Sequence, residues 1–298
     1  MLIHKIKVPE GTPKTRLQDY AFEVFKAYIP SRKGIKKAIK RNRIQVDGKI
    51  GNTGDWIISG MEISLSEEIH LVIEDRSDPL EVLYEDDELA VIHKPAGIVV
   101  SGRAKHTVQK KLIASLQSSP AKDNLAIPRP VHRLDKATSG CLLVAKTKYA
   151  QMYLGEGLSE RSIKKFYTTL VFGETPFKGS IMLQIEGKTA ISQFTCKQIH
   201  PSLSHKWISE LEVSPLTGRT HQIRIHCQAM GHPIIGDPLY KGAFKNPKGK
   251  GLFLHASKIA FKKPGQKEAI VVESVLPNKF SRYLKLERDR WHKFRSKT

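Results

Sequence analysis

The sequence predicts an α+β protein with a small N-terminal domain and a larger second domain. Segments that read as strands and isolated helices mix without the regular alternation that predicts a doubly wound parallel sheet. The chain has 298 residues. At roughly 100–200 residues per domain, this length fits a small domain followed by a larger one. The polar stretch 73–81 contains an Asp-Pro step and reads as a linker. We therefore expect domains at 1–75 and 78–298.

The charge of the chain restricts its function most. Lysine and arginine together number 50 against 29 acidic residues, which gives a net charge of +21 with neutral histidines. The hydrophobic and charged fractions, 40% and 27%, are those of an ordinary globular protein that can bury a core. A cationic surplus of this size favours a polyanionic partner, either nucleic acid or an anionic membrane surface.

Cysteine usage and hydropathy indicate the compartment. Cys141, Cys196 and Cys227 lie far apart and form no CxxC pair. A disulfide framework is therefore not expected, and a reducing compartment fits. The first residues lack the apolar core of a secretory signal, and no run of 18 apolar residues predicts a membrane span. We expect a cytoplasmic protein.

The small domain contains a strongly basic predicted helix that begins after Ser31, a suitable N-cap residue. On a helix its cations would cover about 180° of the surface with no acid among them. These cations are Arg32, Lys33, Lys36, Lys37, Lys40 and Arg41. Such an arc is either a solvated face or a nucleic-acid contact, and the absence of an acid favours RNA or DNA. A membrane helix would need larger apolar residues opposite the cations. The dipeptide Asp47-Gly48 predicts a hairpin turn after the helix.

Strand and helix patterns recur in the larger domain. Residues 139–147 predict a strand that follows a Thr-Ser-Gly turn, and the β-branched and aromatic run 166–172 predicts another. A helix is expected between Thr220, as a possible N-cap, and Gly231 at the C′ position.

The C-terminal twenty residues form a basic tail with aromatic residues at helical spacing. Phe280, Leu284, Trp291 and Phe294 make an apolar stripe that Arg288 interrupts. The tail is either a helix that packs its aromatic side chains on the larger domain or a second RNA contact. In the second case, Trp291 would be available for base stacking.

The motifs of several enzyme classes are absent from the sequence. It has no complete Walker loop, no GxSxG elbow, no HExxH pair and no GxGxxG after a strand. The histidines near Cys227 match no zinc spacing. We therefore expect neither a metal nor a cofactor.

Asp135, in the segment HRLDKATSG, is the candidate catalytic carboxylate. It lies between Arg133 and Lys136, and neighbouring cations keep a carboxylate ionised, as a nucleophile or a proton-abstracting base requires. The alternative is a structural aspartate that caps the turn at 138–140. No second carboxylate stands at an evident partner position, which disfavours a glycosidase-like acid/base pair.

Several segments resemble the motifs of the RluA-like pseudouridine synthases, and they occur in the order of that family. HRLDKATSG is similar to the catalytic motif, and the segment from Lys165 to Tyr167 to the K-x-Y motif. LYEDDELAVIHKPAG, PLTGRTHQIRIH, GHPIIGDPLY and LFLHASKIAF are similar to further family segments. Residues 16–65 resemble the alpha-L RNA-binding module that often precedes this catalytic domain.

The resemblance implies a fold, a reaction and residue roles. The fold would be a catalytic domain with a mixed, largely antiparallel central sheet, preceded by a small α/β RNA-binding module. The reaction is isomerisation of uridine to pseudouridine within RNA, which needs no cofactor and no metal. Asp135 would be the essential carboxylate, and Arg224 would pair with it. Tyr167 would stack on the target base and could assist proton removal at C5. Arg133, Arg219 and His221 would contact the RNA. Arg133 would enter the base stack at the position that the target uridine leaves.

The resemblance also implies the partner. Large-subunit ribosomal RNA is favoured, because the accessory module commonly accompanies ribosomal RNA enzymes, and transfer RNA is the alternative substrate. A non-catalytic RNA-binding or ribosome-assembly factor would share the fold and the charge. The presence of Asp135, Tyr167 and Arg224 together favours an enzyme. We expect a monomer that does not bind membranes.

Overall fold

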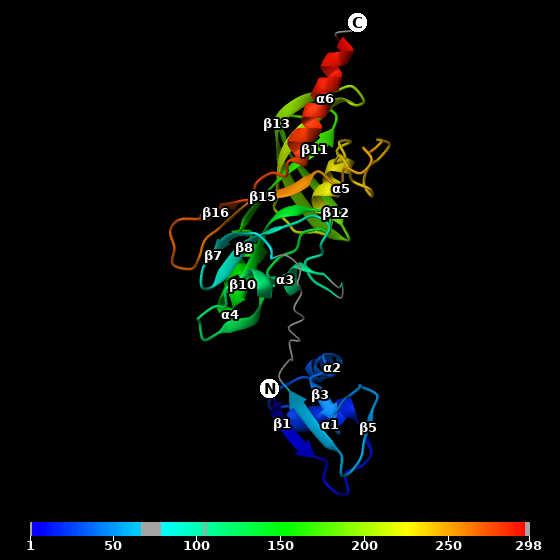
Figure 1. Cartoon of the computed structure of the whole chain (residues 1–298), viewed down its shortest axis with the longest axis vertical. Helices are drawn as coiled ribbons and strands as arrows, with labels where there is room; N and C mark the ends of the chain where they lie inside the picture. The colour runs from blue at the N-terminus through cyan, green and yellow to red at the C-terminus, as the bar shows by residue number, and fades with distance from the viewer. Residues whose placement is uncertain (1, 67–78, 103, 105, 296–298) are drawn as a thin grey trace. The chain divides into compact units, whose positions relative to one another are not determined.

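The chain folds into two compact units, Met1–Glu74 and Asp75–Thr298 (Figure 1). The computed structural model describes residues 2–66, 79–102, 104 and 106–295. Residues 73–78 of the predicted linker lie outside these described residues. None of the helices in the described part of the chain is long and apolar enough to cross a membrane.

The first unit packs two helices, α1 (Leu17–Phe25) and α2 (Arg32–Lys40), with two small antiparallel sheets. The four-stranded sheet has the order β1 (Leu2–Lys7), β6 (Glu62–Ser66), β3 (Ile44–Val46) and β4 (Lys49–Ile50). The second sheet pairs β2 (Thr15–Arg16) with β5 (Trp56–Ile57). The unit has a hydrophobic core of its own, which includes Leu17, Phe25 and Ile35.

Helix α2 begins where the sequence predicted. The Ser31 side chain accepts a hydrogen bond from the amide of Gly34 at 3.0 Å, so it caps the helix. The apolar face is buried, and all six predicted cations are exposed. No acid lies within α2 itself, as the sequence indicates, but Asp19 of α1 binds Arg32 at 2.5 Å. Neighbouring helices can supply a counter-charge that one helix does not reveal.

The second unit is built on one large sheet with the order β12-β13-β14-β11-β15-β10-β8-β7. Strand β16 pairs with β15 at its edge, and β9 pairs with β10. The bounds of the first six strands are β7 (Val82–Glu85), β8 (Leu89–Lys94), β9 (Asn124–Pro130), β10 (Ser139–Thr147), β11 (Lys164–Phe172) and β12 (Lys178–Ile185). The others are β13 (Lys188–Ser202), β14 (Lys206–Pro215), β15 (Leu254–Phe261) and β16 (Ile270–Glu273). Only β10 and β15 pair in parallel among the described strands, so the predicted mixed, largely antiparallel α+β fold is confirmed.

Both faces of the sheet centre are buried. Along β8, Ala90 and Ile92 enter one hydrophobic core while Leu89 and Val91 enter another, as the two-residue period of a strand requires. Helix α3 (Val108–Ser115) supplies side chains to the first core. Helix α4 (Lys148–Ser159) supplies side chains to the second. The central strands are therefore fixed on both faces, and the loops at their ends start from rigid positions.

Strand β10 begins at a position that only glycine can occupy. Gly140 has a φ of +114°, and a Cβ atom there would lie 2.2 Å from the carbonyl oxygen of Ala256 in β15. The close parallel approach of β10 and β15 therefore depends on the absence of a side chain. This contact fixes the start of β10 directly after the loop that carries Asp135.

Helix α5 (Gln222–Ala229) starts two residues after the predicted N-cap. Thr220 does not cap it, because His221 takes a left-handed conformation with a φ of +55°. The Gln222 side chain instead accepts hydrogen bonds from the Thr217 hydroxyl at 2.7 Å and the Arg219 amide at 3.0 Å. Those side-chain bonds decide where the helix begins. Gly231, with a φ of +81°, follows the C-cap as predicted.

Helix α6 (Lys279–Arg295) lies along β13 (Figure 1). Of the predicted stripe only Phe280 is fully buried, and the other buried positions of the helix are Tyr283 and Glu287. Glu287 is only 2% exposed and accepts a hydrogen bond from the Ser202 hydroxyl at 2.5 Å. The Trp291 ring lies 6.2 Å from that of Trp207. Of the two sequence-based alternatives, the structure therefore supports a packed helix.

Glu287→Ala should destabilise the second unit, because it leaves the buried Ser202 hydroxyl without its acceptor. An unsatisfied buried group costs ~1–3 kcal/mol, which corresponds to a loss of about 2–12 °C in Tm for a domain of this size. The control is Asp289→Ala, which removes an exposed acid from the same helix. Equal melting temperatures for the two variants, measured by thermal denaturation, would contradict the docking role of Glu287.

Candidate active site

A cavity of about 470 Å³ in the second unit brings together all the side chains that the sequence singled out there. Its walls come from the β9–β10 loop, the start of β11 and the segment from the end of β14 into α5. The predicted site residues in the lining are Arg133, Asp135, Tyr167, Arg219, His221 and Arg224. Six lysine and arginine residues and one acid, Asp135, line the cavity. Its charge therefore suits an anionic ligand.

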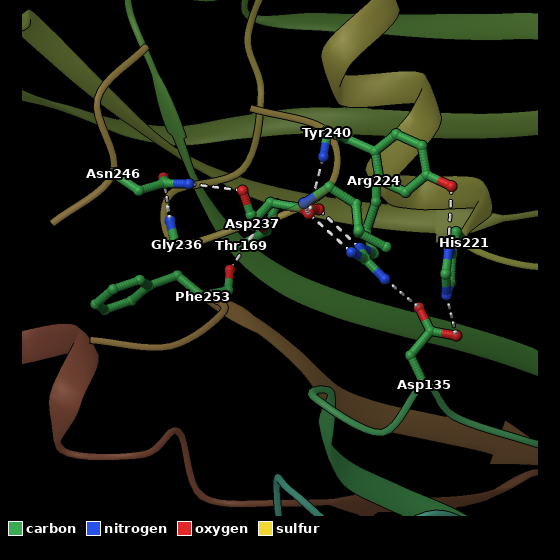
Figure 2. A network of polar contacts seen from close by, with 10 residues as sticks. Asp135, Thr169, His221, Arg224, Gly236, Asp237, Tyr240, Asn246 and Phe253 are labelled. Carbon is green, nitrogen blue, oxygen red and sulfur yellow. Dashed lines mark hydrogen bonds and ion pairs between the residues drawn. The ribbon is translucent and has the colours of Figure 1, made fainter. Parts of the chain in front are cut away.

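The Asp135 carboxylate stands between two basic side chains (Figure 2). The Arg224 Nη1 atom lies 3.5 Å from one carboxylate oxygen, and the His221 Nε2 atom lies 3.9 Å from the other. The Asp135 side chain is 18% exposed, so the cavity still reaches it. Its backbone carbonyl accepts a hydrogen bond from the Thr138 amide at 3.1 Å, which closes the turn before β10.

A buried lysine fixes the loop that carries Asp135. Lys94, at the end of β8, donates hydrogen bonds from Nζ to the carbonyl oxygens of Pro95, Lys136 and Thr138, at 2.9, 3.3 and 2.8 Å. Burial lowers the pKa of Lys94 to about 8, although the Asp135 charge acts in the opposite direction. Two of the three acceptors belong to the Asp135 loop, so Lys94 limits how far that carboxylate can move.

Arg224 is bound mainly by a second carboxylate, Asp237. The Arg224 Nε and Nη2 atoms each donate a hydrogen bond to one Asp237 oxygen at 2.7 Å, as Figure 2 shows. Both side chains are buried, with 5% and 0% exposure. A bidentate pair fixes the plane of the guanidinium, and Nη1 is left to face Asp135. Arg224 therefore reaches Asp135 in an orientation that Asp237 sets.

Asp237 is itself held by the loop that follows it. Its carboxylate accepts hydrogen bonds from the amides of Leu239 and Tyr240 at 2.9 and 3.1 Å. Its backbone carbonyl accepts one from the Asn246 side chain at 2.6 Å. Burial acts to raise the pKa of Asp237, but the bonds from Arg224, Tyr240 and Leu239 outweigh it and lower the pKa overall. The sequence analysis missed this residue, although it lies in the quoted segment GHPIIGDPLY.

His221 reaches the site from just outside α5, and its orientation is fixed. Its Nδ1 atom lies 3.0 Å from the Tyr240 hydroxyl, while Nε2 faces Asp135 (Figure 2). The left-handed conformation of His221 turns its side chain away from the regular helical direction. His221 lies outside α5, so it and Arg224 do not meet at Asp135 through a shared helical face.

Tyr167 forms part of the cavity wall from β11 and is only 8% exposed. Burial, with the charge of Asp135 adding to it, raises the pKa of the Tyr167 hydroxyl above its ordinary value. The hydroxyl is therefore protonated at neutral pH. It can offer a flat ring and a hydrogen-bond donor, but not a phenolate.

The other predicted RNA contacts belong to both units. Arg133 and Arg219 are exposed in the cavity lining, and the Arg219 Nε atom donates to the Thr189 carbonyl at 3.4 Å. The six α2 cations belong to the first unit.

Comparisons with known proteins identify the family. Residues 88–229 match the family described as RNA pseudouridylate synthase. The ribosomal large subunit pseudouridine synthase D of Neisseria meningitidis serogroup B is 34% identical over 275 residues, which cover 83% of this chain and 72% of that protein. The protein of the same name from Xanthomonas campestris pv. campestris is 32% identical over 315 residues, covering 95% and 92%.

A solved structure shares the fold. Human RNA pseudouridylate synthase domain containing 1 is 27% identical with a TM-score of 0.54, and the match covers 66% of this chain and 83% of that chain. The family match at 88–229 includes every residue that lines the cavity except Leu254. The chain therefore belongs to the RluA-like family of RNA pseudouridine synthases.

Proposed function

We propose that this RNA pseudouridine synthase acts on uridines in large-subunit ribosomal RNA. Relatives named ribosomal large subunit pseudouridine synthase D match it over 72% and 92% of their own lengths. The observation that carries the proposal is a single carboxylate, Asp135, which Arg224 holds in a cavity whose other charged lining residues are lysines and arginines. A ribosomal substrate is consistent with the cytoplasmic location that we expect.

Asp135 supplies the essential carboxylate in this proposal. During isomerisation the bond between N1 and the ribose breaks, the base rotates, and C5 forms the new bond to the same ribose carbon. C5 loses its proton and N1 gains one, so the atoms balance without a cofactor. The Asp135 carboxylate either attacks the nucleoside as a nucleophile or takes the ribose 2′ proton. In both cases Arg224, whose Nη1 atom lies 3.5 Å from one carboxylate oxygen, holds the carboxylate in position.

Tyr167 provides the platform for the target base in this proposal. Its ring lies in the same cavity wall as Asp135, where a base could stack on it. The raised pKa of its hydroxyl counts against a phenolate that would take the C5 proton. The protonated hydroxyl can still donate a hydrogen bond to the base. Tyr167 would therefore hold the base rather than remove its proton.

Arg133 and the α2 cations bind the surrounding RNA in this proposal. A base must leave its stack to reach a closed active site, at a cost of a few kcal/mol. Arg133 is exposed in the cavity lining, where its guanidinium could occupy the vacated position. The exposed face of α2 supports phosphate contacts, as expected for an alpha-L module. Arg219 and His221 would contact the target nucleotide from the opposite wall.

Mapping pseudouridines in a deletion strain tests the substrate. Large-subunit ribosomal RNA should lack pseudouridine at specific sites, and the wild-type gene should restore them. Asp135→Asn should not restore them, because loss of a group that transfers protons typically slows reactions by about 10²–10⁴-fold. Purified Asp135→Asn should still bind RNA, since one charge among many changes. Missing sites in transfer RNA alone would contradict the ribosomal proposal, and turnover within tenfold of wild type would contradict the role of Asp135.

Arg224→Lys should lower activity by at least about 100-fold. An ammonium group cannot make two parallel hydrogen bonds to Asp237 while facing Asp135, and a 1 Å misplacement can cost about 10²-fold. Arg219→Lys is the matched control, because Arg219 lines the same cavity but is exposed and contacts a backbone carbonyl. Single-turnover rates that fall equally in both variants would show that Arg224 holds no special position.

Removal of residues 1–75 should leave a folded but weakly active catalytic unit, because each unit has its own core. Each phosphate contact that is lost should flatten the log–log salt dependence of RNA binding by about 0.9 on a duplex and 0.7 on single strands. Neutralising the α2 lysines in the full chain should reproduce much of this change. If the truncated chain and the chain with neutralised α2 lysines both keep the salt slope of wild type, the module does not bind phosphates.

A further inference from the structure

Lys165 lies beside Tyr167 in the cavity, and the mechanism above leaves it without a role. Tyr167 follows Lys165 by two positions on β11. The two side chains therefore lie on the same face of the strand, about 7 Å apart along it. Both line the cavity. Phe166, between them, points to the other face, where its ring contacts the Lys258 ammonium at 4.6 Å.

Lys165 is half-buried but has no hydrogen-bond or ion-pair partner among the residues that the structure describes. Two other lysines withdrawn from solvent have ion-pair partners. Lys146 binds Glu85 at 2.7 Å, and Lys263 binds Glu88 at 2.9 Å. Withdrawing an ammonium group from water is costly unless an anion or acceptors replace the water. The free chain therefore maintains an uncompensated positive charge in the cavity wall.

The neighbours of Lys165 cannot neutralise it. Burial and the charge of Lys165 lower the pKa of His132 to about 3, so this histidine is neutral. Its Nε2 atom accepts a hydrogen bond from the Leu143 amide at 3.1 Å. Asp135, the one acid in the lining, is engaged by Arg224 and His221. The compensating anion must then come from the ligand.

We infer that Lys165 binds a phosphate of the RNA backbone at the target nucleotide. The inference rests on the proposed function, in which the base stacks on Tyr167 and the ribose lies at Asp135. Two positions along a strand span about 7 Å, which is close to the length of one nucleotide along an RNA backbone. Binding this phosphate would fix the sugar–phosphate backbone while the base is detached and rotates. Lys165 is thus a substrate-positioning residue, and its charge is used when RNA is bound.

The test compares three full-length variants on an in vitro transcript of large-subunit ribosomal RNA. Lys165→Gln removes the charge, Lys165→Arg retains it, and Lys148→Gln removes an exposed charge from α4 as a control. Lys165→Gln should raise KM about tenfold or more relative to the control, the scale of one hydrogen bond to a charged group. It should also reduce the salt slope of binding by about 0.7–0.9. Lys165→Arg should remain close to wild type in both.

Two further readouts separate this role from others. The melting temperature of Lys165→Gln should equal or exceed that of wild type, since an unpaired charge is removed; a clear decrease would overturn the inference in favour of a structural role. A loss of kcat with unchanged KM in Lys165→Arg would also overturn it, because the lysine would then be a base. Equal KM values for Lys165→Gln and Lys148→Gln would do the same. If wild type does not modify the transcript, the ribosomal substrate proposal fails, and the salt slopes still test Lys165.

Discussion

The guanidinium of Arg224 is shared between two carboxylates with different surroundings, and the geometry of the site depends on this sharing. Asp237 is fully buried and takes two hydrogen bonds, so it fixes the guanidinium plane. Asp135 is partly open to the cavity and receives the remaining nitrogen at 3.5 Å. Breaking a buried pair of this kind is costly, because an uncompensated charge remains. The tight Arg224–Asp237 pair therefore supports the looser Arg224–Asp135 pair, and Asp135 stays accessible to a substrate.

This support extends outward through backbone contacts. The loop after Asp237 is tied to it by Asn246, and the loop of Asp135 is tied to β8 by Lys94. Gly140 brings β10 against β15 directly after the Asp135 loop. Charged groups are thus held by rigid strands that are buried on both faces. Such preorganisation lets an active site stabilise developing charge without rearranging during the reaction.

The distribution of charge separates binding from chemistry. The acids of the site, Asp135 and Asp237, are both paired with Arg224. Cations line the rest of the charged cavity wall and cover the exposed face of α2. Binding to a polyanion draws on many cations that each contribute modestly and depend on salt. Isomerisation requires no added electrons or water, so the chain's own groups can supply its proton transfers. A strongly basic protein whose cavity lining contains one carboxylate matches both demands.

The sequence determined the fold class, the two faces of α2 and the family, because periodicity and contiguous motifs are local properties. It also singled out Asp135, Tyr167 and Arg224, which one cavity of the structure brings together. Only the tertiary structure decided the rest. Asp237 is about 100 positions from Asp135 and meets it only through Arg224. Gln222, at the start of α5, also donates hydrogen bonds to Ile191 and Ser192 in β13, and the buried face of α6 depends on Ser202 in β13. These choices follow from long-range contacts, because a side chain's partner is set by which strands become neighbours, and the local pattern of a segment carries no record of that.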